Sequence, residues 1–145
     1  MPIYLDWLAQ PSEQDIIDLD KLYHDAPKGW QDEIGQPLNA QWALNCLSQD
    51  CKLAMGRFND KVVCAAWLIK QPEGSAHTYL YRVDKLCVRS ITRERGVAKQ
   101  LMVRLCQWAK ENAYDLYVKD PDNGLSGLYE LGFVQYEQGW RYIAH

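Results

Sequence analysis

The feature that most constrains this fold is a change of hydrophobic period on the two sides of one glycine. The segment "HTYLYRVDKLCV", residues 77–88, is rich in aromatic and β-branched side chains, which predicts a long strand. After Gly96 the apolar side chains recur at a spacing close to 3.6 residues, which predicts an amphipathic helix from Gly96 to about Asn112. Because "YDLYV" then has the pattern of another strand, the chain is predicted to make a strand–helix–strand crossover.

The segments before this crossover predict helices and a hairpin. A first strand is expected at Ile3–Leu8, and Ser12 before "EQDIIDLDKLY" is typical of a helix start. A second helix is predicted over Leu38–Leu47, while the stretch "APKGWQDEIGQP" between the two helices carries Pro and Gly and interrupts the helical pattern. In "KLAMGRFNDKVVCAAWLIK" two apolar runs flank Asn59–Asp60, whose residue types tolerate left-handed backbone, and this predicts a β-hairpin.

The remaining segments complete the predicted fold. "KQPEGSAHT" is predicted to be a loop between strands, "LSGLYEL" a short helix, and "GFVQYEQGWRYIAH" two strands around a turn at Glu137–Gly139. Together the elements predict an α+β fold with a mixed, mostly antiparallel central sheet of about six or seven strands, flanked by about four helices.

Length and charge limit the possible functions. A chain of 145 residues is expected to form a single domain over residues 1–145. It has no apolar run long enough for a membrane helix and no N-terminal signal pattern, so we expect a cytoplasmic protein without a membrane partner. A net charge of −3 argues against general nucleic-acid binding, which normally goes with a basic face.

Cysteine and histidine spacing predicts neither a disulfide framework nor a metal site. The 5 cysteines are odd in number, and no two are spaced C-x-x-C. Cys64, Cys87 and Cys106 lie in apolar segments and are interpreted as small buried side chains rather than nucleophiles. The 3 histidines are scattered along the chain without metal-ligand spacing.

Positive charge gathers around the glycine turn of this acidic chain, on Arg82, Lys85, Arg89, Arg93, Arg95 and Lys99. The first amides of a helix lack intrahelical acceptors and carry partial positive charge, so further cations there are unfavourable unless an anion offsets them. Gly96 and the small Ala98 would let a ligand approach the backbone. Two interpretations stay open: a solvated helix start with incidental basic residues, and a binding site for phosphate or pyrophosphate.

The segment "VRSITRERGVA" resembles the signature of the GNAT acetyltransferase superfamily. In that signature an Arg or Gln, two residues, a Gly, one residue and a Gly or Ala bind the pyrophosphate of acetyl-CoA, and the matching positions here are Arg93, Gly96 and Ala98. The order of elements matches the GNAT fold over nearly the whole chain, and "LYELGF" resembles the closing segment of that family. The resemblance implies acetyl-CoA (or CoA) as cofactor, bound by Cys87, Val88, Arg93, Arg95, Gly96, Val97, Ala98 and Lys99.

A closer resemblance is to one branch of that superfamily. "SEQDIIDLDKLY", "GRFNDK", "LCVRSITRERGVAKQL" and the terminal "GW" are similar to the aspartate 1-decarboxylase maturation factors (PanZ/PanM type). Members of this branch bind acetyl-CoA and promote the self-cleavage that makes the decarboxylase pyruvoyl group, which links pantothenate synthesis to acetyl-CoA level. The resemblance implies the decarboxylase precursor as partner and Arg57 and Asn59 as turn residues presented to it, although the region Trp30–Gln49 is longer than in the branch.

The catalytic groups of an acetyltransferase are less evident than the cofactor site. Many GNAT enzymes place a Tyr acid four residues before the Gly of the "GF" segment; here Leu128 holds that position and Tyr129 follows it. Tyr129 is therefore interpreted either as the acid or as a packing residue. Some relatives carry a Glu base where this chain has Arg82. Asp84 lies on the same predicted strand face, either as the base or in a surface ion pair with Arg82 or Lys85.

Three hypotheses follow for the function. The first is a non-catalytic acetyl-CoA sensor that acts on the decarboxylase precursor. The second is an active N-acetyltransferase that moves acetyl from acetyl-CoA to a small amine or a protein amino group. The third is a GNAT-like scaffold that has lost its ligand. We favour the sensor, because the cofactor site is better supported than the acid and the base, and the question of enzymatic activity stays open.

Overall fold

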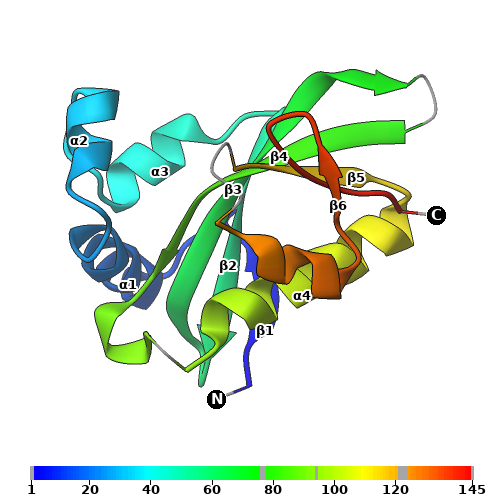
Figure 1. The fold of residues 1–145 in the computed structure, drawn as a ribbon. Coiled ribbons are helices and arrows are strands. Elements are labelled where there is room, and N and C mark those ends of the chain that lie inside the picture. Colours follow the sequence, from blue (N-terminus) through cyan, green and yellow to red (C-terminus); the bar gives the residue numbers. More distant parts are fainter. Residues whose placement is uncertain (1, 76–77, 94, 121–123, 145) are drawn as a thin grey trace.

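The computed structural model describes residues 2–75, 78–93, 95–120 and 124–144 and contains a mixed sheet with helices on both faces (Figure 1). The sheet has 7 strands in the order β1-β2-β3-β4-β5-β7-β6. Their bounds are Tyr4–Trp7 (β1), Cys51–Phe58 (β2), Lys61–Ser75 (β3), Thr78–Val88 (β4), Asp115–Lys119 (β5), Val134–Tyr136 (β6) and Gly139–Tyr142 (β7). All neighbouring strands run antiparallel except β4 and β5, which are parallel. The predicted α+β class and mostly antiparallel sheet are confirmed.

The helices follow the predicted order, with two additions, α2 and the 3₁₀ helix η1. Their bounds are Glu13–His24 (α1), Gly29–Ile34 (α2), Ala40–Cys46 (α3) and Val97–Asn112 (α4), together with the 3₁₀ helices Ser90–Thr92 (η1) and Ser126–Leu131 (η2). α4 makes the predicted crossover between the parallel strands β4 and β5. The crossover places the start of α4 at the end of β4, where the glycine turn lies.

The predicted start of α1 at Ser12 is confirmed by a reciprocal cap. Ser12 Oγ accepts a hydrogen bond from the Asp15 backbone N–H at 3.1 Å, and Asp15 Oδ2 accepts one from the Ser12 N–H at 3.2 Å. This capping box satisfies two amides that the helix itself cannot. The helix buries one apolar face, with Leu19, Leu22 and Tyr23 each at most 1% exposed.

α2 was not predicted from the sequence pattern. It lies inside "APKGWQDEIGQP" and ends at Gly35, whose φ of 82° provides a left-handed C-cap. None of its residues is buried, so no apolar period marks the helix in the sequence. α3 lies within the predicted range, and Asn39 caps it by accepting a hydrogen bond from the Trp42 N–H at 2.9 Å.

The hairpin between β2 and β3 is confirmed, but β3 is longer than predicted. Asn59 and Asp60 have φ values of 49° and 66°, as a two-residue type I′ turn requires. The loop prediction for "KQPEGSAHT" is wrong in part, because β3 continues to Ser75. Residues 76–77 of this segment lie outside the described ranges. β2 pairs with β3 as far as Ile69. In the described part of the chain Pro72 therefore has no strand neighbour on the β2 side of β3, a position at which sheets tolerate proline.

Two apolar layers attach the helices to the sheet. On one face, Leu22 of α1 and Trp42 of α3 pack with Trp67 of β3. On the other face, Leu101 of α4 and Leu128 of η2 belong to a separate buried cluster. In Figure 1, α1 to α3 lie on one side of the sheet and α4 crosses in front of it. Within the described ranges no helix is long and apolar enough to cross a membrane.

Substitution of Asn59 tests the turn. We expect the Asn59→Ala variant to lower the free energy of unfolding by about 1 kcal/mol, because left-handed backbone is costly for alanine and less so for asparagine. The Asn59→Gly variant is the matched control and should unfold within about 0.5 kcal/mol of the unchanged protein, since glycine adopts positive φ freely. Urea denaturation measures both values, and equal stability of the two variants would contradict the predicted strain.

Candidate functional site

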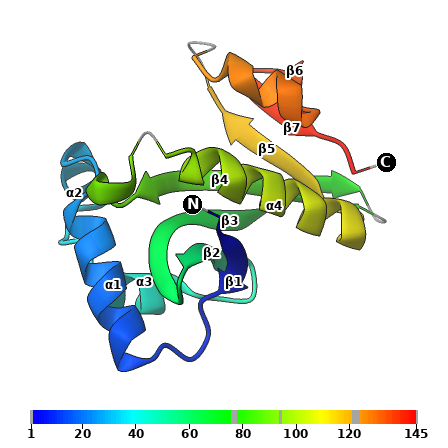
Figure 2. The ribbon, with the colours of Figure 1, turned by 90° about the horizontal axis from the view of Figure 1, so that it is seen from below.

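The site predicted at the glycine turn lies where β4 and β5 diverge. β4 pairs with β3 along most of its length but with β5 only at residues 80–82. From Val83 to Val88 the β5 side of β4 has no strand neighbour in the described part of the chain, and Figure 2 shows β5 running away from β4. An open strand edge leaves backbone N–H and C=O groups available to a ligand.

A β-bulge lies in this open part of β4. Lys85 and Leu86 are opposite the single residue Ala66 of β3, and Lys85 has a φ of 51°. A bulge bends its strand and redirects the side chains that follow it. Leu86 and Val88 consequently pack on the α4 side of the sheet.

α4 begins next to the open edge, and among the described residues no side chain caps its start. Its N-cap residue, Gly96, has a φ of 73°, and a Cβ added there would meet no atom within 4 Å. The backbone conformation, rather than a lack of space, therefore requires glycine at this position. The amides of Val97, Ala98 and Lys99 belong to the first turn, whose N–H groups have no intrahelical acceptors and carry the positive end of the helix dipole.

A cavity of about 310 Å³ lies beside this helix start. Its wall is mostly apolar, and its lining residues are Leu86, Ala98, Lys99, Met102, Gly124, Leu125, Gly127, Leu128, Glu130 and Leu131. The two charged lining residues form an exposed ion pair, with Lys99 Nζ at 3.7 Å from Glu130 Oε2. An apolar hollow next to uncapped helix amides suits a ligand with a thin apolar arm and an anionic group.

The three basic residues among the predicted acetyl-CoA contacts have different positions. Arg93 extends toward α1, where its Nη2 donates a hydrogen bond to the backbone oxygen of Asp25 at 2.7 Å. Arg95 is exposed, and Lys99 lines the cavity. The structure thus brings Lys99 to the cavity and directs the Arg93 side chain to the end of a neighbouring helix.

The Cys87 side chain packs on the α1 side of the sheet, away from α4, whereas the Val88 side chain packs on the α4 side. The Cys87 side chain is 3% exposed, and its thiol donates a hydrogen bond to the Leu22 backbone oxygen at 3.4 Å, on the α1 side of the sheet. Burial raises the pKa of Cys87 to about 11, so the thiol is protonated at neutral pH. These observations agree with the predicted buried cysteine.

The two predicted catalytic residues do not line the cavity. Tyr129 is 71% exposed and borders a separate hollow with Val134 and Trp140, whereas Leu128 lines the cavity. Asp84 forms the surface ion pair that the sequence offered as one interpretation, with its Oδ2 at 3.5 Å from Arg82 Nη2. The roles of Tyr129 as acid and Asp84 as base stay predictions.

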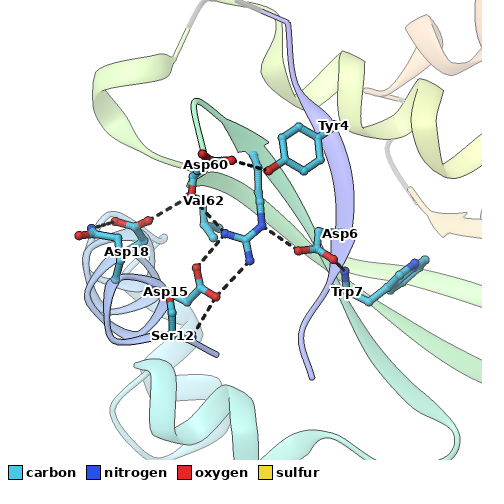
Figure 3. A network of polar contacts seen from close by, with 10 residues as sticks. Tyr4, Asp6, Trp7, Ser12, Asp15, Asp18, Asp60 and Val62 are labelled. Atoms are coloured by element: carbon cyan, nitrogen blue, oxygen red, sulfur yellow. Dashed lines mark hydrogen bonds and ion pairs between the residues drawn. The ribbon is translucent and has the colours of Figure 1, made fainter. Parts of the chain in front are cut away.

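Arg57 lies in a network of polar contacts at the β2–β3 hairpin, and Figure 3 labels its partners Asp6, Asp15 and Asp60. Its Nη1 and Nη2 donate to the two carboxylate oxygens of Asp15 at 2.8 and 3.1 Å, and its Nε donates to Asp6 at 2.8 Å. Nη1 also donates a hydrogen bond to the backbone oxygen of Asp60 at 3.2 Å. The side chain is only 11% exposed, so its guanidinium faces inward, while Asn59 at the tip of the turn is exposed.

Sequence reasoning missed the apolar wall of the cavity. Leu125, Leu128 and Leu131 recur every three residues, which is the period of a 3₁₀ helix rather than an α-helix. That spacing was the available signal for a short helix with one apolar edge. Asp25 and Glu130 were also not predicted, because their partners, Arg93 and Lys99, are distant in the sequence.

Solved structures share this fold over nearly the whole chain. YhhK from E. coli, solved bound to coenzyme A, has a TM-score of 0.60 and 22% identity, covering 99% of both chains. A GNAT family acetyltransferase from Staphylococcus aureus has a TM-score of 0.66 and 19% identity, covering 96% of both. A ribosomal-protein-alanine N-acetyltransferase from Brucella melitensis has a TM-score of 0.64 and 18% identity, covering 94% of both. At these identities the likeness establishes the fold, and the predicted GNAT fold is confirmed.

Sequence comparison assigns the family. No curated protein matches the chain significantly. The family described as "Acetyltransferase (GNAT) domain, PanZ" matches residues 2–118, which cover most of the chain and include β1 to β4, the glycine turn and α4. The chain therefore belongs to the PanZ family of GNAT acetyltransferase domains.

Proposed function

We propose that this protein binds acetyl-CoA (or CoA) at the start of α4 and acts in the cytoplasm as a ligand-dependent partner of the aspartate 1-decarboxylase precursor. The observation that carries the ligand proposal is the juxtaposition of uncapped amides, Lys99 and the apolar cavity of about 310 Å³. Membership of the PanZ family supports it, as does the coenzyme A bound to the structurally similar YhhK.

The residues present fit such a ligand. Acetyl-CoA would supply a pyrophosphate, a thin pantetheine arm and a thioester. The amides of Val97, Ala98 and Lys99 would hold the pyrophosphate, with the Lys99 ammonium adding charge and Arg95 adding to the local positive field. The open edge of β4, including the backbone of Cys87 and Val88, would hydrogen-bond the amide groups of the arm.

The positions of the ionisable residues favour a sensor over a standard enzyme. Acetyl transfer from a CoA thioester needs a base for the amine and an acid for the thiolate. A leucine, Leu128, lines the cavity where many GNAT enzymes have a tyrosine, and neither Tyr129 nor Asp84 lines it. By family resemblance, the proposed action is to promote self-cleavage of the precursor, so that pantothenate synthesis follows acetyl-CoA level. We propose Asn59 as a contact to the precursor and Arg57 as the residue that holds this turn in place.

One mixture tests both activities. Precursor incubated with this protein and acetyl-CoA is expected to self-cleave at least several-fold faster than precursor alone, as measured from the masses of the two fragments. Free thiol, measured in the same mixture, should not accumulate in proportion to cleavage. No acceleration would contradict the maturation role. Thiol release with amine acceptors, together with no effect on the precursor, would instead support the active N-acetyltransferase.

A further inference from the structure

Asp25, at the C-terminal end of α1, holds the loop that joins β4 to α4. One of its carboxylate oxygens, Oδ2, accepts hydrogen bonds from the Ser90 N–H at 2.9 Å, the Ser90 hydroxyl at 3.1 Å and Arg89 Nε at 3.2 Å. Its backbone oxygen accepts the bond from Arg93 Nη2 at 2.7 Å. A single residue outside the loop therefore receives bonds from three residues of the loop.

Further hydrogen bonds within the loop connect Ser90 to the residues that precede α4. The Thr92 N–H and hydroxyl both donate to the Arg89 backbone oxygen at 2.9 Å, and Thr92 is 2% exposed. The Arg93 N–H then donates to the Ser90 oxygen, and the Arg95 N–H donates to the Thr92 oxygen, each at 3.3 Å. Gly96 follows directly. These hydrogen bonds connect Ser90, which Asp25 holds, to the residues just before the first turn of α4.

The charges explain how a carboxylate is tolerated beside an anion site. Partial burial acts to raise the pKa of Asp25, but the bonds from Ser90 and Arg89 outweigh it and lower the pKa, so the carboxylate stays ionised. Arg89 and Asp25 are both 18% exposed and form an ion pair, so the negative charge is compensated locally. Arg93 meanwhile places its cation at the C-terminal end of α1, which carries the negative end of that helix dipole.

We infer that Asp25 is a positioning residue of the acetyl-CoA site, which holds the β4–α4 loop so that the first amides of α4 face the phosphates of the ligand. The inference rests on the proposed function for the identity of the ligand. It assigns Arg93, the first residue of the family signature, to anchoring the loop on α1. Asp25 itself would touch no part of the ligand, and its effect would pass through Ser90 and the turns that follow.

Variants of Asp25 test this role in the full-length protein. We expect Asp25→Ala to weaken CoA binding roughly tenfold or more, because small misplacement of preorganised groups is costly. Asp25→Asn keeps one acceptor oxygen for Ser90 and should weaken binding less. Asp32→Asn, at an exposed position of α2, makes the same charge change away from the loop and should bind CoA as the unchanged protein does. Calorimetry measures these affinities at one ionic strength.

A ligand without phosphates separates positioning from general damage. Acetyl-pantetheine, titrated by NMR, should lose much less affinity than CoA in the Asp25→Ala variant, because it has no phosphates and most residues that line the cavity lie outside the first turn of α4. Equal weakening of both ligands would overturn the inference, as would unchanged CoA binding by the alanine variant. If the alanine variant does not fold, the Asp25→Asn variant carries the same comparison. Absence of CoA binding by the unchanged protein would overturn the proposed function, and the inference with it.

Discussion

The Arg57→Ala variant is expected to lose about 3–5 kcal/mol of unfolding free energy, because it leaves a buried carboxylate without its partner. Both terminal nitrogens of Arg57 donate hydrogen bonds to Asp15, which is 7% exposed, and its Nε donates one to Asp6. These bonds join the first turn of α1 to the β2–β3 hairpin and to β1. Thermal or urea unfolding at neutral pH measures the loss. Arg104→Ala, at an exposed position of α4, removes the same charge and should cost less than about 0.5 kcal/mol.

The pH dependence of this loss identifies its cause. The hydrogen bonds from Arg57 hold the pKa of Asp15 below its usual range, so the stabilisation is complete above the unfolded-state pKa of about 3.9. It is lost as the pH falls from there through the lower folded-state pKa. The gap between the unchanged protein and Arg57→Ala should therefore narrow on acidification below about pH 4. A gap that stays constant across this range would indicate lost packing rather than a lost ion pair.

Local signals in the sequence were sufficient for most of the fold. The Ser12 cap, the Asn59–Asp60 turn and the change of period at Gly96 each involve residues that are close in the chain, and each was predicted in the right place. The crossover rule then predicted the strand–helix–strand unit. α2 was not predicted because it buries no residue. The end of β3 was not predicted because it contains Pro72, and a strand tolerates proline there only because β2 stops pairing with β3 at Ile69.

The details of the site depend on contacts between distant segments, which no local pattern encodes. The signature placed Gly96 and Ala98 at the helix start, but it could not show that Arg93 bonds to Asp25, 68 residues earlier. Likewise, "GRFNDK" predicted a turn without showing that Arg57 faces a carboxylate 42 residues earlier. The sign of a charge is readable in the sequence, whereas the partner that compensates it is set by the tertiary fold. Both arginines were expected at ligand or partner surfaces, and both have structural partners in the fold.

The Ala98→Glu variant is expected to lower acetyl-CoA affinity at least roughly 100-fold, because a carboxylate within a few ångströms of the ligand phosphates costs several kcal/mol at a partly exposed site. Ala98 lies in the first turn of α4 and lines the cavity, so the added side chain would also occupy ligand space. The same change should leave the fold as stable as before or slightly more stable, since an acidic residue at a helix N-terminus gains about 0.3–1 kcal/mol from the helix dipole. Loss of binding with unchanged or raised Tm is thus the expected combination.

The control for this variant lies on the same helix. Gln107→Glu adds the same charge at an exposed position of α4 that does not line the cavity, and it should bind acetyl-CoA as the unchanged protein does. Calorimetry at one salt concentration compares all three proteins, because surface electrostatics weaken as ionic strength rises. Unchanged binding by Ala98→Glu would mean that the phosphates do not approach the start of α4. Equal weakening by Gln107→Glu would mean that net charge, rather than the uncapped helix end, governs the affinity.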